Sequence, residues 1–210
     1  MENRVKYPRT KHVPFSLGAG KDDLFHKDLK FFDGREIALS EKLDGENTTL
    51  YRDHIHARSL DSVDHPSRHW VKGLWGSMKY EIPDGWRICG ENLYATHSIH
   101  YTDLPSYFMV LSIWDENNVC LSLDDTLTIC DYLKLEHVPI LWRGIFNEEF
   151  IKNFKLDLTI NEGYVIRVTD SFSYDDFDTS VAKFVRKGHV TTDDHWMYKK
   201  VVPNELKPKN

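Results

Sequence analysis

The sequence has little cysteine and no long apolar run. Its 210 residues include three cysteines, Cys89, Cys120 and Cys130, which lie in apolar stretches without CxxC spacing. This pattern argues against a disulfide framework and a zinc site, so we expect reduced core cysteines and a cytoplasmic location. No stretch approaches the roughly 20 apolar residues that span a membrane, and the start, MENRVKYPRT, lacks an apolar signal segment. We therefore expect no membrane association.

The sequence also lacks a basic excess. The net charge is −6, which argues against a general basic nucleic-acid binder but allows a local basic groove. An apolar fraction of 40% and an aromatic fraction of 13% predict a folded chain, long enough for one good core. We expect a basic arm over residues 1–30, one main domain over 31–190 and a short tail over 191–210.

The hydrophobic patterns predict one mixed α+β domain in which antiparallel strands dominate. A helix is expected within 66–80, with Ser67 as its N-cap, and another within 147–154, capped by Asn147. A third helix should begin near Asp124 and Asp125, since acids suit a first helical turn. Strands are expected over 36–42, 48–52, 55–59, 85–94, 107–115, 162–168 and 181–186, with a buried strand over 138–146.

Four short segments place charged residues at or near strand ends. They are EKLDG (41–45), GEN (90–92), EGYVIRV (162–168) and AKFVRKG (182–188). Taken singly, each fits an ordinary structural role, such as a turn, a surface acid or a protective lysine on an edge strand. Their order and spacing favour a common functional site.

These segments resemble the motifs of the covalent nucleotidyltransferase superfamily, which comprises polynucleotide ligases and mRNA capping enzymes. Lys42–Gly45 matches the nucleophile motif KxDG, and CGENLYATHSIHY (89–101) resembles the third motif in its RNA-ligase form. EGYVIRV and AKFVRKG resemble the fourth and fifth motifs. The resemblance extends from about Glu36 to Arg186 and favours the phage and bacterial nick-sealing RNA ligases. It implies a nucleotidyltransferase (ligase adenylylation) core over 31–190, with antiparallel sheets, packed helices and no obvious OB-fold domain.

The resemblance implies that Lys42 attacks the α-phosphate of ATP and carries AMP. The attacking amine must be neutral, whereas a free lysine has a pKa of about 10.4. Burial and a nearby cation lower such a pKa, and Lys183 with a bound Mg²⁺ (or Mn²⁺) would supply the positive charge. The fourth motif offers Glu162 as the metal-binding carboxylate.

The resemblance also implies roles around the nucleotide. Glu41 would contact the adenine and Glu91 the ribose, while Asn47 would lie near the water shell of the metal. Arg58 would face a phosphate; a turn amide for Asn47 and a surface position for Arg58 are the alternatives. Lys183 would bind phosphate, with Arg186 or Lys187 as the second basic group. Related ligases cover the adenine with an aromatic residue, where this sequence has Leu111, with Phe108 and Trp114 at the opposite strand parity.

The implied function is an ATP-dependent RNA ligase acting in RNA repair. It would join a 3′-hydroxyl to a 5′-phosphate, through lysyl-AMP and an adenylylated RNA end, most readily in a nicked or bridged duplex. The N-terminal arm would hold an RNA end or phosphate, or else remain solvated. The alternatives are a DNA-nick ligase, a guanylyltransferase, or a non-catalytic module that binds nucleotides or RNA ends. The oligomeric state is left open.

Overall fold

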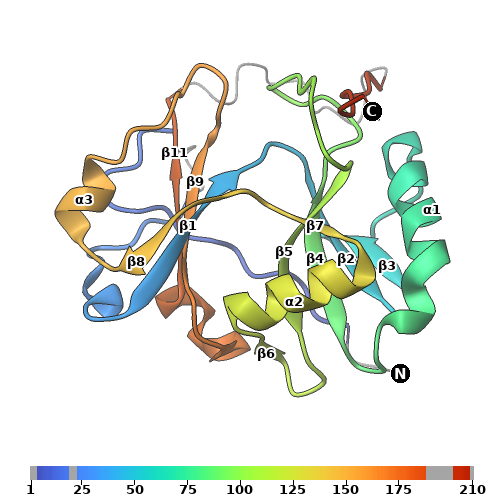
Figure 1. Cartoon of the computed structure of the whole chain (residues 1–210), viewed down its shortest axis with the longest axis horizontal. Coiled ribbons are helices and arrows are strands. Elements are labelled where there is room, and N and C mark those ends of the chain that lie inside the picture. The colour runs from blue at the N-terminus through green and yellow to red at the C-terminus, as the bar shows by residue number, and fades with distance from the viewer. Residues whose placement is uncertain (1–3, 19–22, 188–200, 209–210) are drawn as a thin grey trace.

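The computed structural model describes residues 4–18, 23–187 and 201–208, and it contains two antiparallel sheets side by side (Figure 1). Sheet A has four strands in the order β11-β9-β1-β8. Its strands are β1 (Glu36–Lys42), β8 (Ile140–Ile145), β9 (Gly163–Val168) and β11 (Val181–Val185). Both long neighbours of β1 run antiparallel to it.

Sheet B has the order β10-β6-β5-β4-β2-β3, and a further short strand, β7, pairs in parallel with β5. Its strands are β2 (Glu46–Tyr51), β3 (Ile55–Ala57), β4 (Arg87–Asn92), β5 (Phe108–Trp114), β6 (Val119–Cys120), β7 (Glu136–His137) and β10 (Phe172–Ser173). The register between β4 and β5 shifts so that Gly90 opposes Val110 while Cys89 opposes Ser112. Leu111 is therefore the extra residue of a β-bulge, which reverses the side-chain parity of β5 at this point.

Helices cover the sheets and close the ends of the molecule (Figure 1). The α-helices are α1 (His69–Met78), α2 (Leu123–Leu133) and α3 (Glu148–Lys152), and 3₁₀ turns cover Lys30–Phe32, Pro66–Arg68, Lys79–Glu81 and Tyr174–Thr179. The predicted cap of α3 is confirmed, since the Asn147 side chain accepts from the Phe150 amide. The predicted Ser67 cap is wrong: His65 caps the 3₁₀ turn that precedes α1, accepting from the Ser67 amide.

The predicted strands and helices are otherwise present, with one error in burial. β8 is a strand as expected, but it lies at the edge of sheet A and its residues are exposed or half-buried. Its apolar sequence, ILWRGI, suggested a central position because an apolar run alone does not distinguish an edge strand from a buried one. All three cysteines are reduced and buried, as predicted.

β1 ends in sheet A and β2 begins in sheet B, so residues 43–45 are the link between the two sheets. Separate apolar clusters lie on the two sides, one around Ile37, Leu39 and Ile166 and another around Leu50 and Ile88. Leu43 itself is buried in a third cluster. The chain therefore turns from one packed layer to the next immediately after Lys42.

The described parts of both ends pack onto this core. The arm runs along the free edge of β11: the Val13 amide donates to the Lys183 carbonyl at 2.8 Å and the Lys183 amide to the Lys11 carbonyl at 3.0 Å. In the tail, the Asn204 side chain is buried and donates to the Leu93 carbonyl at 2.7 Å. Residues 4–18 of the arm are therefore packed against the core and are not a freely solvated segment. The domain boundaries at 30 and 190 stay predictions.

Within the residues described, no helix combines the length and apolar character needed to cross a bilayer.

Alanine substitutions at two glycines, one at the strand contact and one control, test the packing between β9 and β11. A Cβ at Gly163 would lie 1.9 Å from the Phe184 carbonyl oxygen, whereas one at Gly76, on the exposed face of α1, would meet nothing within 4 Å. We expect Gly163→Ala to lower the free energy of unfolding by about 3 kcal/mol through overpacking. Gly76→Ala should raise it by about 0.5–1 kcal/mol through helix propensity. Urea denaturation measures both, and an unchanged midpoint for Gly163→Ala would contradict the close strand packing.

Candidate active site

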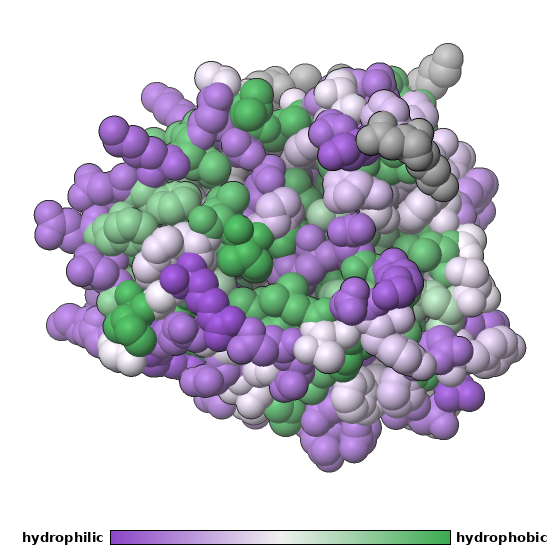
Figure 2. Space-filling model, viewed as in Figure 1, coloured by the Kyte–Doolittle hydropathy of each residue, from purple (hydrophilic) through white to green (hydrophobic). Residues whose placement is uncertain are grey.

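A cleft of about 1190 Å³, part of it open solvent, lies between the sheets and is large enough for a small-molecule ligand. One face of sheet A forms its floor, because most lining residues alternate along each strand: Ala38, Ser40 and Lys42 on β1, Val165 and Arg167 on β9, and Val181 and Lys183 on β11. Glu41 also lines the cleft, near the end of β1. Sheet B, the arm and the link from β7 to β8 supply the other walls. In the view of Figure 2, apolar residues gather near the middle of the molecular surface.

Lys42 is the last residue of β1 and lies opposite Gly163 of β9. That register places Glu162 beside the lysine, and the distance from Lys42 Nζ to Glu162 Oε2 is 2.7 Å. Glu162 is only 3% exposed, so this ion pair lies largely out of water. The fourth motif, EGYVIRV, had placed Glu162 in the same predicted site as Lys42.

Asp44 holds the turn that follows Lys42. Its Oδ2 accepts from the Ser98 amide at 2.7 Å, the Ser98 hydroxyl at 2.6 Å and the Ile99 amide at 3.1 Å. The Asp44 amide donates to the Tyr101 hydroxyl at 2.9 Å. The aspartate of KxDG therefore binds the loop after β4 and fixes the backbone next to Lys42.

Glu91 approaches the same turn from sheet B. It lies opposite Asn47 on β2, and its Oε1 accepts from the Gly45 amide at 3.1 Å. A side chain at position 45 would not fit, since a Cβ there would lie 2.5 Å from the Asn92 carbonyl oxygen. The glycine of KxDG is thus required by the close approach of β4.

The charges around Lys42 raise its pKa. Burial acts to lower it, but the attraction of Glu162 and Glu91 outweighs burial, and the net direction is upward. This direction holds without the bound cation that the expectation of a lowered lysine pKa included, so that expectation stays a prediction. Burial also raises the pKa of the Glu91 carboxyl to about 8.

Cations also line the cleft. Burial, assisted by the charge of Lys42, lowers the pKa of Lys183, which lies on the floor and whose Nζ is 3.9 Å from Asp23 Oδ1. Arg58 directly follows β3 and is exposed, and Arg9 of the arm lines the cleft with its Nη2 3.8 Å from the same oxygen of Asp23. The cleft therefore holds three basic residues besides Lys42, two of which lie beside Asp23.

The structure brings most of the predicted site residues together. Those that line the cleft are Glu41, Lys42, Asn47, Arg58, Glu91 and Lys183. Glu162 reaches it through Lys42, whereas Arg186 and Lys187 follow β11 and do not line it. The Arg186 amide instead donates to the Glu162 carbonyl at 2.9 Å.

The described residues contain no group of three His, Cys, Asp or Glu side chains arranged to hold a metal ion. A single carboxylate is nevertheless compatible with Mg²⁺, which keeps several waters and binds through one or two carboxylates together with substrate phosphates. Glu162, a carboxylate 2.7 Å from Lys42 Nζ at the cleft, fits that donor set.

Sequence reasoning missed several cleft residues. Because the bulge at Leu111 reverses parity, Trp114 lines the cleft together with Leu111, whereas Phe108 does not. Arg167 and His137 line its inner end. EGYVIRV contained Arg167, but only the pairing of Arg167 with Ala38 shows that it shares a face with Lys42. No sequence signal singled out His137.

The chain matches a known protein family. The model of the RNA ligase family matches residues 35–185, more than two thirds of the sequence, so the chain belongs to the RNA ligase family. The match coincides with the segment that carries the four motifs. No curated protein sequence matches the chain significantly.

Solved ligase structures share the fold. Naegleria gruberi RNA ligase with PPi aligns with a TM-score of 0.55 and 18% identity, over 88% of this chain and 61% of that chain. A putative ATP-dependent DNA ligase from Aquifex aeolicus aligns with a TM-score of 0.55 and 23% identity, over 86% and 50%. A lysine-to-alanine mutant of the Naegleria enzyme with ATP and Mn gives 0.53 and 18%, over 75% and 52%. The predicted α+β nucleotidyltransferase core is thereby confirmed, and the chain spans about half to three fifths of these chains.

The burial of Glu91 predicts a distinct pH dependence. Its folded pKa of about 8 exceeds the ordinary value of 4.5, so the stability from the neutral form is present below about pH 4.5 and is lost as the pH rises through 8. Glu91→Gln cannot ionise. Its melting temperature minus that of the wild type should therefore increase steadily from pH 5 to pH 8.5.

Thermal melts across this range measure the difference. Glu36→Gln is the control, because hydrogen bonds from Arg143 and Thr169 hold the pKa of Glu36 below its ordinary value of 4.5, the direction opposite to that of Glu91. The melting temperature of Glu36→Gln should keep a constant difference from that of the wild type across this pH range. A constant difference for Glu91→Gln as well would show that Glu91 is already ionised at neutral pH.

Proposed function

We propose that the protein is an ATP-dependent RNA ligase that carries AMP on Lys42. The observation that supports this most directly is the buried ion pair of Lys42 Nζ and Glu162 Oε2, 2.7 Å apart, inside a cleft that also holds Glu91 and Lys183. This arrangement supplies a nucleophilic amine, a proton-accepting or metal-binding carboxylate and a phosphate-binding cation. Membership of the RNA ligase family supports the same chemistry.

In the first step the Lys42 amine attacks the α-phosphorus of ATP. A P–N bond forms, the P–O bond to pyrophosphate breaks, and the amine proton leaves to a carboxylate or to water. Glu162 Oε2 is at proton-transfer distance from Nζ. Lys183 and Arg58 lie where they can neutralise phosphate charge as pyrophosphate departs.

The raised pKa of Lys42 means that deprotonation must accompany nucleotide binding. Glu162 would hold Mg²⁺ or Mn²⁺ together with the ATP phosphates, and such an ion supplies positive charge that screens Glu162 from the lysine and stabilises the leaving group. The Naegleria ligase structures with ATP and Mn support this assignment. The ammonium form held by Glu162 is then the resting state of the nucleophile.

In the later steps AMP passes to an RNA 5′-phosphate, and a 3′-hydroxyl displaces AMP to form the phosphodiester. A polar groove that shares Asn47, Arg58 and Glu91 with the cleft extends past His97. An RNA end in this groove would reach the phosphorus bound to Lys42. Phosphate contacts of this kind position a strand without reading its sequence.

A DNA-nick ligase is the second candidate. The observation in its favour is the Aquifex aeolicus DNA ligase, whose fold is as similar to this chain as that of the Naegleria RNA ligase. The two candidates share the first chemical step and differ in the sugar that bears the 3′-hydroxyl.

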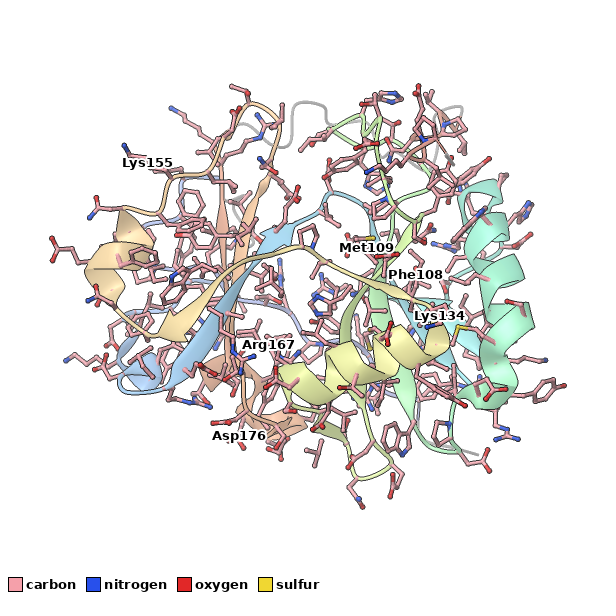
Figure 3. All side chains as sticks on the ribbon, in the orientation of Figure 1. Phe108, Met109, Lys134, Lys155, Arg167 and Asp176 are labelled. Atoms are coloured by element: carbon pink, nitrogen blue, oxygen red, sulfur yellow. The ribbon has the colours of Figure 1, made fainter. Side chains whose placement is uncertain are left out.

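Lys42→Ala should abolish the covalent AMP adduct, because among the described residues no other amine forms an ion pair with Glu162. Intact-mass spectrometry after incubation with ATP and Mg²⁺ detects the adduct directly. Lys155→Ala is the matched control, since Lys155 is exposed on the outer surface away from the cleft (Figure 3) and should leave the yield unchanged. An adduct of wild-type yield on Lys42→Ala would refute the assignment of the nucleophile.

The sugar at the 3′ end should decide the sealing rate. A site that pairs with a 2′-hydroxyl leaves polar groups unpaired against deoxyribose, so sealing of a nick with a terminal 3′ ribose should be faster by about tenfold or more. Pre-adenylylated 5′ ends isolate the last step. A nick whose only deoxyribose is the penultimate sugar is the control and should seal at the ribose rate. Equal rates for the two terminal sugars would favour the DNA-ligase candidate.

A further inference from the structure

One carboxylate of the N-terminal arm lies among the basic groups of the cleft. Asp23 lines the cleft, and its Oδ1 is 3.8 Å from Arg9 Nη2 and 3.9 Å from Lys183 Nζ. Its other oxygen, Oδ2, is 3.6 Å from His12 Nε2. The Asp23 side chain is only 23% exposed, so water screens these contacts incompletely. Asp23 therefore neutralises part of the positive charge that the cleft offers to a phosphate.

Backbone pairing fixes the place of this carboxylate. His12 forms parallel bridges with Lys183 of β11 on one side and with Phe25 on the other. The His12 amide donates to the Leu24 carbonyl at 2.7 Å. Two short segments of the arm thus continue sheet A past β11, and Asp23 directly precedes the outer one. The position of Asp23 beside Lys183 is therefore a property of the fold and not of one side-chain rotamer.

The contacts of Asp23 with the two cations can be exchanged for contacts with a phosphate. Their N–O distances, 3.8 and 3.9 Å, exceed the roughly 2.7–2.9 Å of direct charge-assisted hydrogen bonds. A phosphate group carries a charge of about −1.5 to −2 and three acceptor oxygens, more than a carboxylate offers. A phosphate bound directly to Lys183 would lie close to Asp23, and the two negative charges would repel each other.

From these contacts we infer that Asp23 is a positioning residue that holds Arg9 and Lys183 and competes with the phosphates of the nucleotide for them. Binding of the phosphates separates Asp23 from both cations, and departure of pyrophosphate lets the three groups pair again. The competition lowers the affinity for ATP and for pyrophosphate, and it favours release of pyrophosphate after the transfer to Lys42. This inference rests on the proposed nucleotide transfer to Lys42, and it adds a residue outside the four motifs to those that set phosphate affinity.

The affinity for inorganic pyrophosphate tests this competition directly. Isothermal titration calorimetry without divalent metal compares the wild type with Asp23→Asn, which keeps the size of the side chain and removes its charge. The variant should bind pyrophosphate about fivefold more tightly, the effect of removing one partly exposed charge. The difference should shrink as the salt concentration rises, because salt screens the repulsion that the variant lacks.

The kinetics of adduct formation separate competition from a structural defect. The repulsion by Asp23 acts on bound ATP and on the transition state alike, so its removal should change affinity and not the chemical step. In Asp23→Asn the ATP concentration that gives half the maximal rate should fall about fivefold, with the maximal rate nearly unchanged. Intact-mass spectrometry measures the rate. A distorted cleft would instead lower the rate at saturating ATP.

Asp178→Asn is the matched control. Asp178 Oδ2 lies 2.5 Å from Nζ of Lys11, another basic residue of the arm, but neither of these residues lines the cleft. This variant should keep the wild-type affinity for pyrophosphate and the wild-type dependence of the rate on ATP. A fivefold gain in affinity in Asp178→Asn as well would show a general effect of charge and would overturn the role of Asp23.

The sign of the effect of Asp23→Asn decides the inference. Burial and the charge of Lys42 lower the pKa of Lys183, and Asp23 acts in the opposite direction. If Asp23 served only to keep Lys183 protonated, its replacement would weaken pyrophosphate binding. Equal or weaker binding by the variant therefore overturns the competition while leaving the proposed function intact. If neither the wild type nor Asp23→Asn binds pyrophosphate or forms an adduct with ATP, the proposed function fails and this inference fails with it.

Discussion

The ion pair between Lys42 and Glu162 is the interaction on which the site depends. Two opposite charges, 2.7 Å apart, lie where Glu162 has almost no contact with water. Removing charges from water costs several kcal/mol per ion, and the attraction repays this only in good geometry. Such a pair adds little to stability, and it holds the Lys42 ammonium in place at the end of β1.

Backbone packing sets that geometry. β1 carries Lys42 into the cleft, and the next three residues pass to sheet B, so a small change in either sheet moves the lysine. Two glycines allow the close approach: Gly45 against β4 and Gly163 against β11. Asp44 then ties the turn to the loop after β4 through Ser98 and Ile99. The three conspicuous residues of KLDG therefore have separate structural roles: Lys42 pairs with Glu162, Asp44 binds the loop after β4, and Gly45 allows the close approach of β4.

The same cleft brings acids and bases of an acidic chain together. Carboxylates gather around the Lys42 amine, while Arg9, Arg58 and Lys183 line the same cleft. The packing of the arm against β11 matters here, because it brings Arg9 to the cleft from a segment remote in sequence. Farther from Lys42 along the sheet, Arg167 and His137 line the same cleft.

The local pattern of the sequence was enough to predict the α+β class, the limits of β1, and the helix near Asn147, because alternation and capping are short-range effects. The motifs also predicted that Lys42, Glu91, Glu162 and Lys183 would converge. Three features needed the tertiary structure. The upward shift of the Lys42 pKa depends on how many carboxylates surround it, which spacing does not reveal. The edge position of β8 depends on strand order, and an apolar run is the same in an edge or central strand. The bulge at Leu111 reverses which side chains of β5 face the cleft. Arg167 and His137 line the same cleft only because strands that are distant in the chain pair with one another. The sequence determined which groups were available for chemistry; long-range strand pairing decided which of them share a cavity and how far apart they lie.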